Sequence, residues 1–255
     1  WSISINPYIN LPWQLFRSLA MSRKILSQSL AEQISGQDLG DARVFFENEL
    51  KQANKQLSAL GDEATALDGA YILIQMARSN LGLGDKESCW QTARPLLDVF
   101  IQSGEFELAV EACELLYLSE QEDSIIALGH ACWLAVTYPM KPALSIDMLS
   151  YIIDETPDNS DGAAVAGVVA LYLAETRAEG SDRESLVFLA KQLIAIVAKR
   201  HRGIEDAETI KIWIEMLELN DLDELFKRLA KMLDAIVGNS WWVDRDALRA
   251  ELPDQ

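Results

Sequence analysis

The sequence predicts an all-α protein, and three observations support this prediction. Apolar residues recur at three- and four-residue steps along most of the chain, which is the spacing of one helix face. No stretch of the sequence alternates apolar and polar residues for long enough to form a half-buried strand. The polar turns between the apolar stretches are short, so successive helices are expected to pack antiparallel.

Helix start and stop signals divide the chain into about eleven helices and a short terminal one. The expected spans are 12–35, 39–60, 62–82, 86–102, 105–118, 122–138, 142–155, 161–179, 182–202, 205–219 and 221–237, with the terminal piece at 244–251. Pro95 lies inside the fourth span. Because proline lacks a backbone donor, it should kink or split that helix.

Glycines and capping residues mark several of these boundaries. Gly84 and Gly238 follow apolar stretches and tolerate the positive φ that commonly ends a helix. Ser181 to Glu184 have the spacing of a capping box, in which hydroxyl and carboxylate satisfy free backbone donors. Asn220 is expected to cap the helix that Gly238 closes.

The charge balance restricts the partners that the protein can bind. Its 22 basic and 40 acidic residues give a formal net charge of −18 over 255 residues. A field of that sign repels nucleic-acid phosphates and anionic lipid headgroups, and it attracts basic partners. We therefore expect no nucleic-acid binding, and membrane contact only through a partner or through residues 1–20.

The number and placement of the three cysteines indicate whether the protein is expected in a reducing or an oxidising environment. Cys89, Cys113 and Cys132 each lie in an apolar helical stretch, where a thiol usually acts as a small buried hydrophobe. An odd number without a close pair argues against a disulfide framework. The sequence has no apolar run long enough for a transmembrane helix. These features favour a reducing, cytoplasmic setting.

Catalytic motifs are missing from the sequence. The chain has two histidines, His130 and His201, and neither belongs to a metal or catalytic signature. His130 lies two residues from Cys132, but such near neighbours on one helix point in different directions. We expect a packed helix there, and we expect that the protein is not an enzyme.

Two acidic stretches resemble metal sites only superficially. When Gly162 is aligned with the sixth position of a calcium loop, Pro157 falls at the first ligand position and cannot coordinate. The stretch 218–224 lacks a second matching cluster and suits a helix cap with first-turn acids. We therefore expect no metal and no cofactor.

Three stretches have the organisation of stacked helix pairs: residues 66–97, 103–116 and 125–158. In the first stretch, a helix ends at Leu81-Gly82, a Gly-Asp turn follows, and the next helix has small residues at Cys89 and Ala93. Residues 103–116 have the pattern of the second helix of another such unit. Residues 125–158 have the length of a helix pair, with Pro157 near their end. In outline these features resemble the tetratricopeptide-repeat (TPR) family over residues 64–200. The resemblance implies antiparallel helix pairs stacked as a right-handed α-solenoid that binds peptides.

The first 20 residues differ from the rest of the chain. They contain one charged residue, Arg17, and no acid, and Met21-Ser22-Arg23-Lys24 resembles the start of a protein. Three interpretations remain open. The segment is the first structural element, with one helix beginning at Pro12; or it is a tethered peptide from a partner; or it is an interfacial membrane anchor. We divide the chain into this segment, a helical-repeat domain at 21–240, and an acidic tail with a short helix at 241–255.

Aromatic residues are the candidates for partner contact. On the peptide-like segment they are Tyr8, Trp13 and Phe16, together with Leu11. In the helical domain we rank Trp90, Trp133 and Tyr172 as candidates. Trp241 and Trp242 follow the last long helix. They form an exposed docking pair, or they pack back onto the end of the solenoid.

The sequence therefore predicts a non-enzymatic interaction module, an adaptor or assembly chaperone. Its client would be a protein or peptide with apolar, aromatic and basic side chains. Two other classes remain open. One is a membrane-peripheral scaffold anchored by residues 1–20, and the other is a helical small-molecule-binding protein.

Overall fold

The computed structural model describes residues 36–252, and their side chains from residue 40 onward. Regular structure in this part is helical throughout and contains no strand. In chain order the helices are α2 (Gly36–Ser58), α3 (Ala66–Gly82), α4 (Lys86–Ala93), α5 (Leu96–Gln102), α6 (Phe106–Leu118), α7 (Ser124–Thr137), α8 (Pro142–Glu155), α9 (Asp161–Arg177), α10 (Gly180–Arg202), α11 (Ala207–Met216), α12 (Leu222–Val237) and α13 (Arg245–Ala250). The all-α prediction is confirmed.

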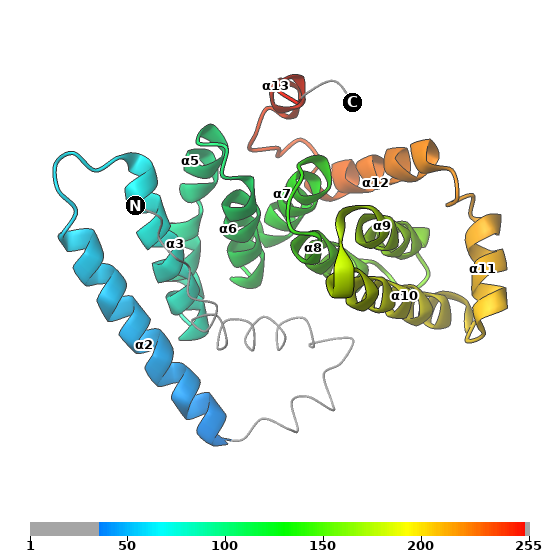
Figure 1. Ribbon diagram of the computed structural model, residues 1–255, viewed down its shortest axis with the longest axis horizontal. Coiled ribbons are helices and arrows are strands. Elements are labelled where there is room, and N and C mark those ends of the chain that lie inside the picture. The colour runs from blue at the N-terminus through cyan, green and yellow to red at the C-terminus, as the bar shows by residue number, and fades with distance from the viewer. Residues whose placement is uncertain (1–35, 253–255) are drawn as a thin grey trace.

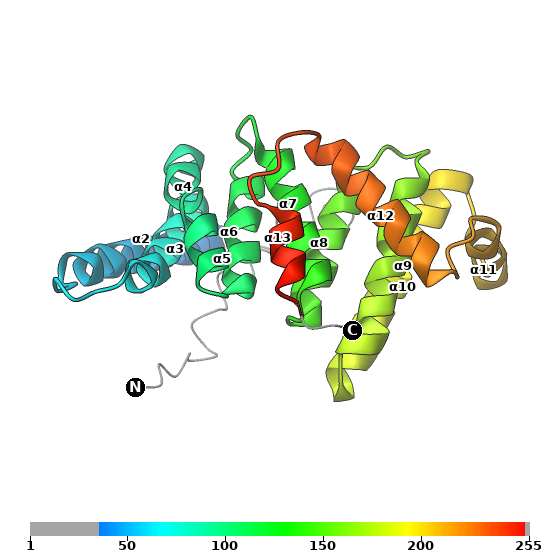
Figure 2. The ribbon, with the colours of Figure 1, turned by 90° about the horizontal axis from the view of Figure 1, so that it is seen from above.

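Adjacent helices pack in pairs along the long axis of the molecule (Figure 1). α2 and α3 form one end, and α10, α11 and the start of α12 form the other. Between them α6 packs against α7, α8 against α9, and α9 against α10. α12 then returns across α7 and α9. The chain after α12 returns to the middle of the molecule (Figures 1 and 2), where the hydroxyl of Tyr138, just after α7, contacts Leu248 of α13.

Most predicted helices lie close to the observed ones. The predicted effect of Pro95 is confirmed, because α4 ends at Ala93 and Pro95 is the N-cap of α5. Gly84 and Gly238 have φ of 85° and 61°, as their helix-ending role requires. The predicted helix 12–35 lies outside the described residues.

Two predicted caps are wrong, one by two residues and the other by one: the N-cap of α10 is Glu179, and that of α12 is Asp221. α10 begins at Gly180, whose φ of 56° turns the chain into the helix before Ser181, so this serine is not the N-cap. α12 is capped by Asp221 instead of Asn220. A carboxylate both accepts the first backbone donors and complements the helix dipole, which favours aspartate over the neighbouring amide.

α7 is the most enclosed helix of the described chain. Its residues from Ala127 to Ala135 are all buried, so it has no polar face. Gly129 allows α12 to approach closely: a Cβ built at this glycine would lie 2.3 Å from Cγ2 of Val237. The packing of α6, α8 and α12 around α7 gives it a fixed position.

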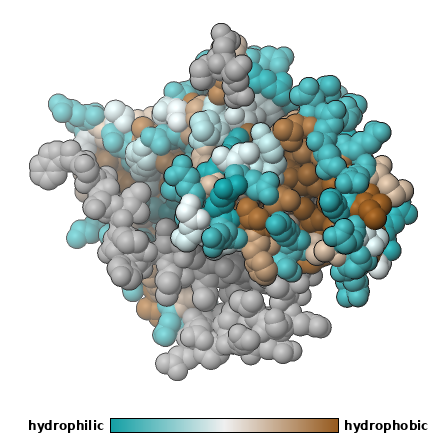
Figure 3. Space-filling view, turned by 45° about the vertical axis from the view of Figure 1, so that its right-hand side comes forward, coloured by the Kyte–Doolittle hydropathy of each residue, from teal (hydrophilic) through white to brown (hydrophobic). Residues whose placement is uncertain are grey.

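Apolar side chains are less completely covered at the α10–α12 end. Figure 3 shows them in a hollow bordered by hydrophilic side chains on the face of that end. On α11 the side chains of Ile212 and Met216 are exposed, and α11 makes few contacts with other helices. This end of the molecule presents apolar surface to solvent.

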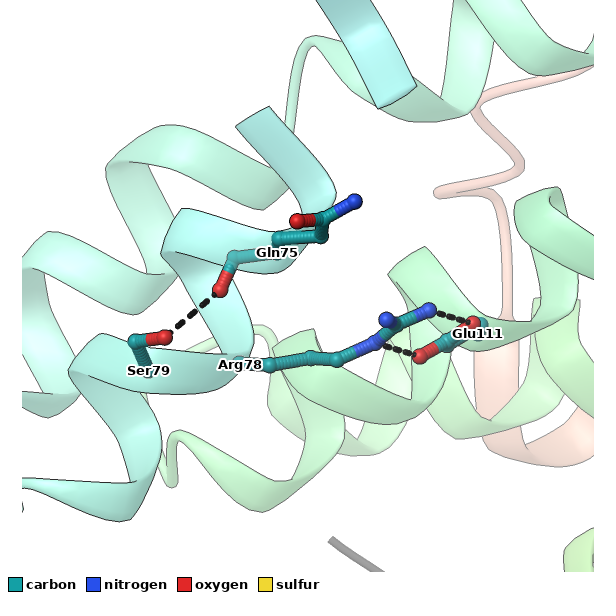
Figure 4. A network of polar contacts seen from close by, with 4 residues as sticks. All are labelled: Gln75, Arg78, Ser79 and Glu111. Atoms are coloured by element: carbon teal, nitrogen blue, oxygen red, sulfur yellow. Dashed lines mark hydrogen bonds and ion pairs between the residues drawn. The ribbon is translucent and has the colours of Figure 1, made fainter. Parts of the chain in front are cut away.

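Several polar contacts between neighbouring helix pairs join side chains that lie 33 to 38 residues apart in sequence. Arg78 of α3 forms an ion pair with Glu111 of α6, 33 residues further on, through both carboxylate oxygens (Figure 4). Tyr71 and Glu105, Lys86 and Glu120, and Glu107 and Lys141 are each 34 residues apart and in contact. Tyr151 and Glu114, and Tyr117 and Glu155, join α8 to α6 at separations of 37 and 38 residues, so α6 makes polar contacts with both α3 and α8.

Arginines cap the carboxyl ends of several helices from neighbouring elements. The guanidinium of Arg177 donates to the carbonyls of Ala135, Val136 and Tyr138 at the end of α7. Arg200 donates twice to the carbonyl of Ile153 in α8. Cationic groups there are favourable because helix carbonyls carry partial negative charge. Arg177 and Arg200 thus connect the ends of α7 and α8 to the helices that follow them.

Candidate functional site

The described part of the chain gathers aromatic side chains where its C-terminal segment crosses α4 and α7. We call residues 238–252 the C-terminal strap. It leaves α12 at Gly238, whose φ of 61° and ψ of −129° reverse the chain direction. The strap then passes α4 and α7 and ends in α13. Its contacts with them join residues that lie more than a hundred positions apart in sequence.

His130 of α7 forms the central polar contact with the strap. Its Nε2 accepts the backbone N–H of Trp242 at 2.8 Å, and its Nδ1 lies 2.9 Å from the carbonyl oxygen of Ile126. Since a carbonyl only accepts, Nδ1 carries the proton and Nε2 is the free acceptor. The imidazole is therefore neutral and has both nitrogens engaged. Its ring also stacks on Trp242, with centroids 4.6 Å apart and planes 20° apart.

Burial holds His130 in this neutral form. Desolvation lowers the pKa of its imidazole to about 4, although the Ile126 carbonyl acts in the opposite direction. The positive charges of Arg94 and Arg245 lower this pKa further. At neutral pH the ring is thus an acceptor towards the strap, and a proton on Nε2 would abolish that role.

Tryptophan rings and arginine guanidinium groups pack against one another where the strap meets α4 and α7. Trp242 lies edge-on to Trp90 of α4 at 6.2 Å, and Trp241 lies edge-on to Trp133 of α7 at 6.3 Å. The Cζ of Arg94 is 4.1 Å from the ring centroid of Trp242. Within the strap, Cζ of Arg245 is 3.7 Å from the ring centroid of Trp241. Cation–π attraction therefore adds to the stacking on both sides of the strap.

α13 lies on the surface and buries none of its residues. The carboxylate of Asp244 caps it by accepting the N–H groups of Asp246 and Ala247. The hydroxyl of Tyr138 donates to the carbonyl of Leu248 at 3.1 Å. Arg245 also forms an ion pair with Asp234 of α12 at 2.8 Å. The strap is therefore held by specific polar and stacking contacts, together with the partly buried side chains of Val243, Leu248 and Leu252.

Four of the nine residues that the sequence suggested for partner contact meet here: Trp90, Trp133, Trp241 and Trp242. Tyr172 does not join them, and packs edge-on against Phe226 of α12 at 5.5 Å. Tyr8, Leu11, Trp13 and Phe16 lie outside the described residues. Trp241 and Trp242 pack back onto the protein, as one of the two interpretations expected, but they lie on α4 and α7 rather than on a terminal pair of helices.

Sequence reasoning missed the roles of His130, Arg94 and Arg245. A signal for the arginines was present, because Trp90 and Trp241 are each followed by an arginine four residues later. The histidine gave no such signal. Only the fold brings the backbone of Trp242 to its ring from 112 positions away.

The other features considered from the sequence have structural roles. Cys132 Sγ lies 3.3 Å from the carbonyl oxygen of Met148 in α8, so it faces away from the strap. Burial raises the pKa of this thiol, which opposes formation of the nucleophilic thiolate. Within residues 36–252, no group of three or more histidine, cysteine or acidic side chains is placed to hold a metal ion.

Comparison with family models, with curated proteins and with solved structures gives no match for this chain. Among the helices of the described part, none is long and apolar enough to cross a membrane.

Proposed function

We propose that this protein is a non-enzymatic helical-repeat module that binds a peptide or subunit with aromatic and basic side chains. One observation carries the proposal: the α4–α7 surface holds the C-terminal strap through two tryptophans, with the arginines of the strap stacked on tryptophan rings. The segment contributes two tryptophans, two arginines and a backbone donor to these contacts, and its acidic residues are Asp244, Asp246 and Glu251. A surface that binds this segment within the chain has the chemistry to bind a similar segment of another protein.

The repeat architecture that we propose is a right-handed, TPR-like α-solenoid. The contacts at separations of 33 to 38 residues support it, because side chains about one repeat apart meet when equivalent helices lie side by side. About 34 residues is also the period of the TPR family. In this arrangement α3, α6 and α8 are the first helices of successive pairs, and the second helices are α4 with α5, α7, and α9.

The charge of the protein favours a basic client. Arg94, Arg177 and Arg200 are engaged with tryptophan rings or helix carbonyls, while the chain as a whole has a charge of −18. The acidic surface would steer basic segments, and stacking on Trp90 and Trp133 would then retain their aromatic side chains.

Residues 1–20 are a second candidate ligand for the same surface. Trp13 and Arg17 have the four-residue spacing of Trp241 and Arg245. Tyr8, Leu11 and Phe16 would supply further anchors. We propose that this segment is a tethered ligand, so that its binding is favoured by a high effective concentration.

The test is a binding titration with a weakened strap. The host is the full chain with Trp13→Ala, Trp241→Ala and Trp242→Ala, so that both the strap and residues 1–20 are weakened as internal ligands, and its folding is checked by helical circular dichroism. We expect saturable binding of a synthetic peptide of residues 239–252, and weaker binding of the same peptide with both tryptophans replaced by alanine. A peptide of residues 1–20 tests the second ligand. A folded host that ignores both peptides would overturn the proposal.

A further inference from the structure

We infer that His130 is a proton-sensitive latch: the strap stays on α7 while the imidazole is neutral, and it is released when Nε2 takes up a proton. This inference concerns regulation of the proposed peptide-binding surface, and it depends on the proposed function for its biological meaning. The latch itself rests on contacts within the described chain.

The geometry makes the latch sensitive to a single proton. In the closed state Nε2 of His130 accepts the N–H of Trp242 at 2.8 Å, while Nδ1–H donates to Ile126. A proton on Nε2 would make that atom a donor facing a donor, and the contact would be lost. No other acceptor for the Trp242 N–H is found among the described residues.

The surroundings oppose the charge that this proton brings. α7 itself has no charged side chain. The charged groups near the contact from the other elements are Arg94 and Asp98 of the α4–α5 region, Asp234 of α12, and Arg245, Asp246 and Arg249 of α13. Three guanidiniums thus surround the aromatic cluster, each paired with one of the three carboxylates. An imidazolium there would be repelled, and moving the strap with its two arginines away relieves that repulsion.

Opening and proton uptake are therefore coupled. In the closed state the pKa of His130 is about 4, and release of the strap exposes the ring and returns its pKa towards the usual 6.5. The ratio of open to closed strap should then rise about tenfold per pH unit below 6.5, to a limit of roughly 300-fold near pH 4. A partner peptide that supplies its own N–H to Nε2 would compete with the strap, and it too would bind less tightly as pH falls.

The experiment measures amide hydrogen exchange of residues 239–252 in the full chain between pH 7 and pH 4. Three proteins are compared at each pH: the wild type, His130→Gln, and His201→Gln as the matched control. Glutamine can accept the Trp242 N–H without titrating in this range. Comparison with it at the same pH also cancels the intrinsic pH dependence of exchange.

We expect strap exchange in the wild type and in His201→Gln to rise relative to His130→Gln as pH falls, towards the 300-fold limit. An equal rise in His130→Gln would show that protonation of the carboxylates opens the strap, and it would overturn the latch. A wild-type strap that stays protected down to pH 4 would overturn it as well.

A further measurement covers the case in which His130→Gln does not fold. The two imidazoles of the wild type are titrated by NMR, and the missing signal in His201→Gln assigns the other one to His130. A midpoint below pH 5 supports the latch, and a midpoint near 6.5 with a protected strap contradicts it. Failure of the peptide titration with a working pH response would overturn the proposed function alone.

Discussion

Of two apolar surfaces in the described chain, one is covered by another segment of the chain and the other is exposed. The surface on α4 and α7 is covered by the C-terminal strap, which places Trp241 and Trp242 on it. The surface at the α10–α12 end is left open, and 54% of Ile212 and 77% of Met216 remain exposed. Because both surfaces are apolar, apolar area alone does not explain why the strap lies on only one of them. The strap lies where polar partners for its backbone exist.

The two histidines show the same difference at the level of atoms. His130 has both ring nitrogens in hydrogen bonds, one of them to the strap. His201 of α10 packs on Trp213 of α11 with centroids 5.5 Å apart, and its Nε2 lies 3.2 Å from Asp161 without hydrogen-bond geometry. His130 therefore holds the strap through a hydrogen bond, whereas His201 packs between α10 and α11.

The largest expected effect comes from an added methyl group on α7. Gly129→Ala would place a Cβ 2.3 Å from Val237, a buried and stiff β-branched side chain. Gly162→Ala, towards the other surface, would instead meet the flexible end of Met232 at 2.8 Å. We expect Gly129→Ala to reduce the free energy of unfolding by about 2–3 kcal/mol, and Gly162→Ala to change it by less than about 1 kcal/mol.

Urea denaturation of each variant measures these changes. Gly69→Ala is the matched control, because a Cβ at this position would meet nothing within 4 Å and α3 should gain about 0.5–1 kcal/mol. Equal losses at Gly129 and Gly162 would mean that α7 is no more tightly enclosed than α9.

The pH dependence of the free energy of unfolding should show the contribution of His130. Because the pKa of His130 is lowered to about 4 in the folded protein, the unfolded chain binds more protons between pH 6.5 and pH 4. The His130 contribution is thus complete above pH 6.5 and is lost as pH falls to about 4. We expect the wild type to lose about 3 kcal/mol more than His130→Gln over this range.

Denaturant midpoints of both proteins at pH 7, 5.5 and 4 measure this difference. Stability curves that stay parallel between wild type and His130→Gln would contradict the neutral, buried state of the ring. His201→Gln, measured alongside, shows whether the effect is specific to the strap.

The sequence was sufficient for the helices and insufficient for the site. The helix signals are local ones: apolar spacing, Pro95 and the glycine stops. Most helix boundaries predicted from them therefore lie close to the observed boundaries. The strap depends on contacts between Trp242 and His130, 112 residues apart, and no local rule encodes such a pairing. The tryptophans were recognised as candidates because aromatic side chains are prominent, but the histidine acceptor follows only from the fold.

A smaller effect is expected from the arginines that cap helix ends on the two sides. Arg177 donates to three carbonyls at the end of α7, beside the strap, and burial lowers the pKa of its guanidinium. Arg200 donates to one carbonyl of α8, near the open end. We expect Arg177→Met to cost about 2 kcal/mol of unfolding free energy and Arg200→Met about 1 kcal/mol.

Thermal and urea denaturation give these values, and Arg183→Met, an exposed position of α10, serves as the reference. Arg177→Lys should recover only part of the loss, because an ammonium lacks the fork that reaches several carbonyls. Full recovery by lysine would mean that charge alone, without the geometry, stabilises the end of α7.

The smallest effect is expected on the open surface itself. Met216→Gln replaces a side chain that is 77% exposed, so little apolar area leaves or enters water on unfolding, and the free energy of unfolding should change by less than about 0.5 kcal/mol. Trp241→Ala, on the covered surface, should release the strap and increase its hydrogen exchange. A loss above about 1 kcal/mol for Met216→Gln would require that another part of the protein covers α11 in solution, and the contrast between the two surfaces would then disappear.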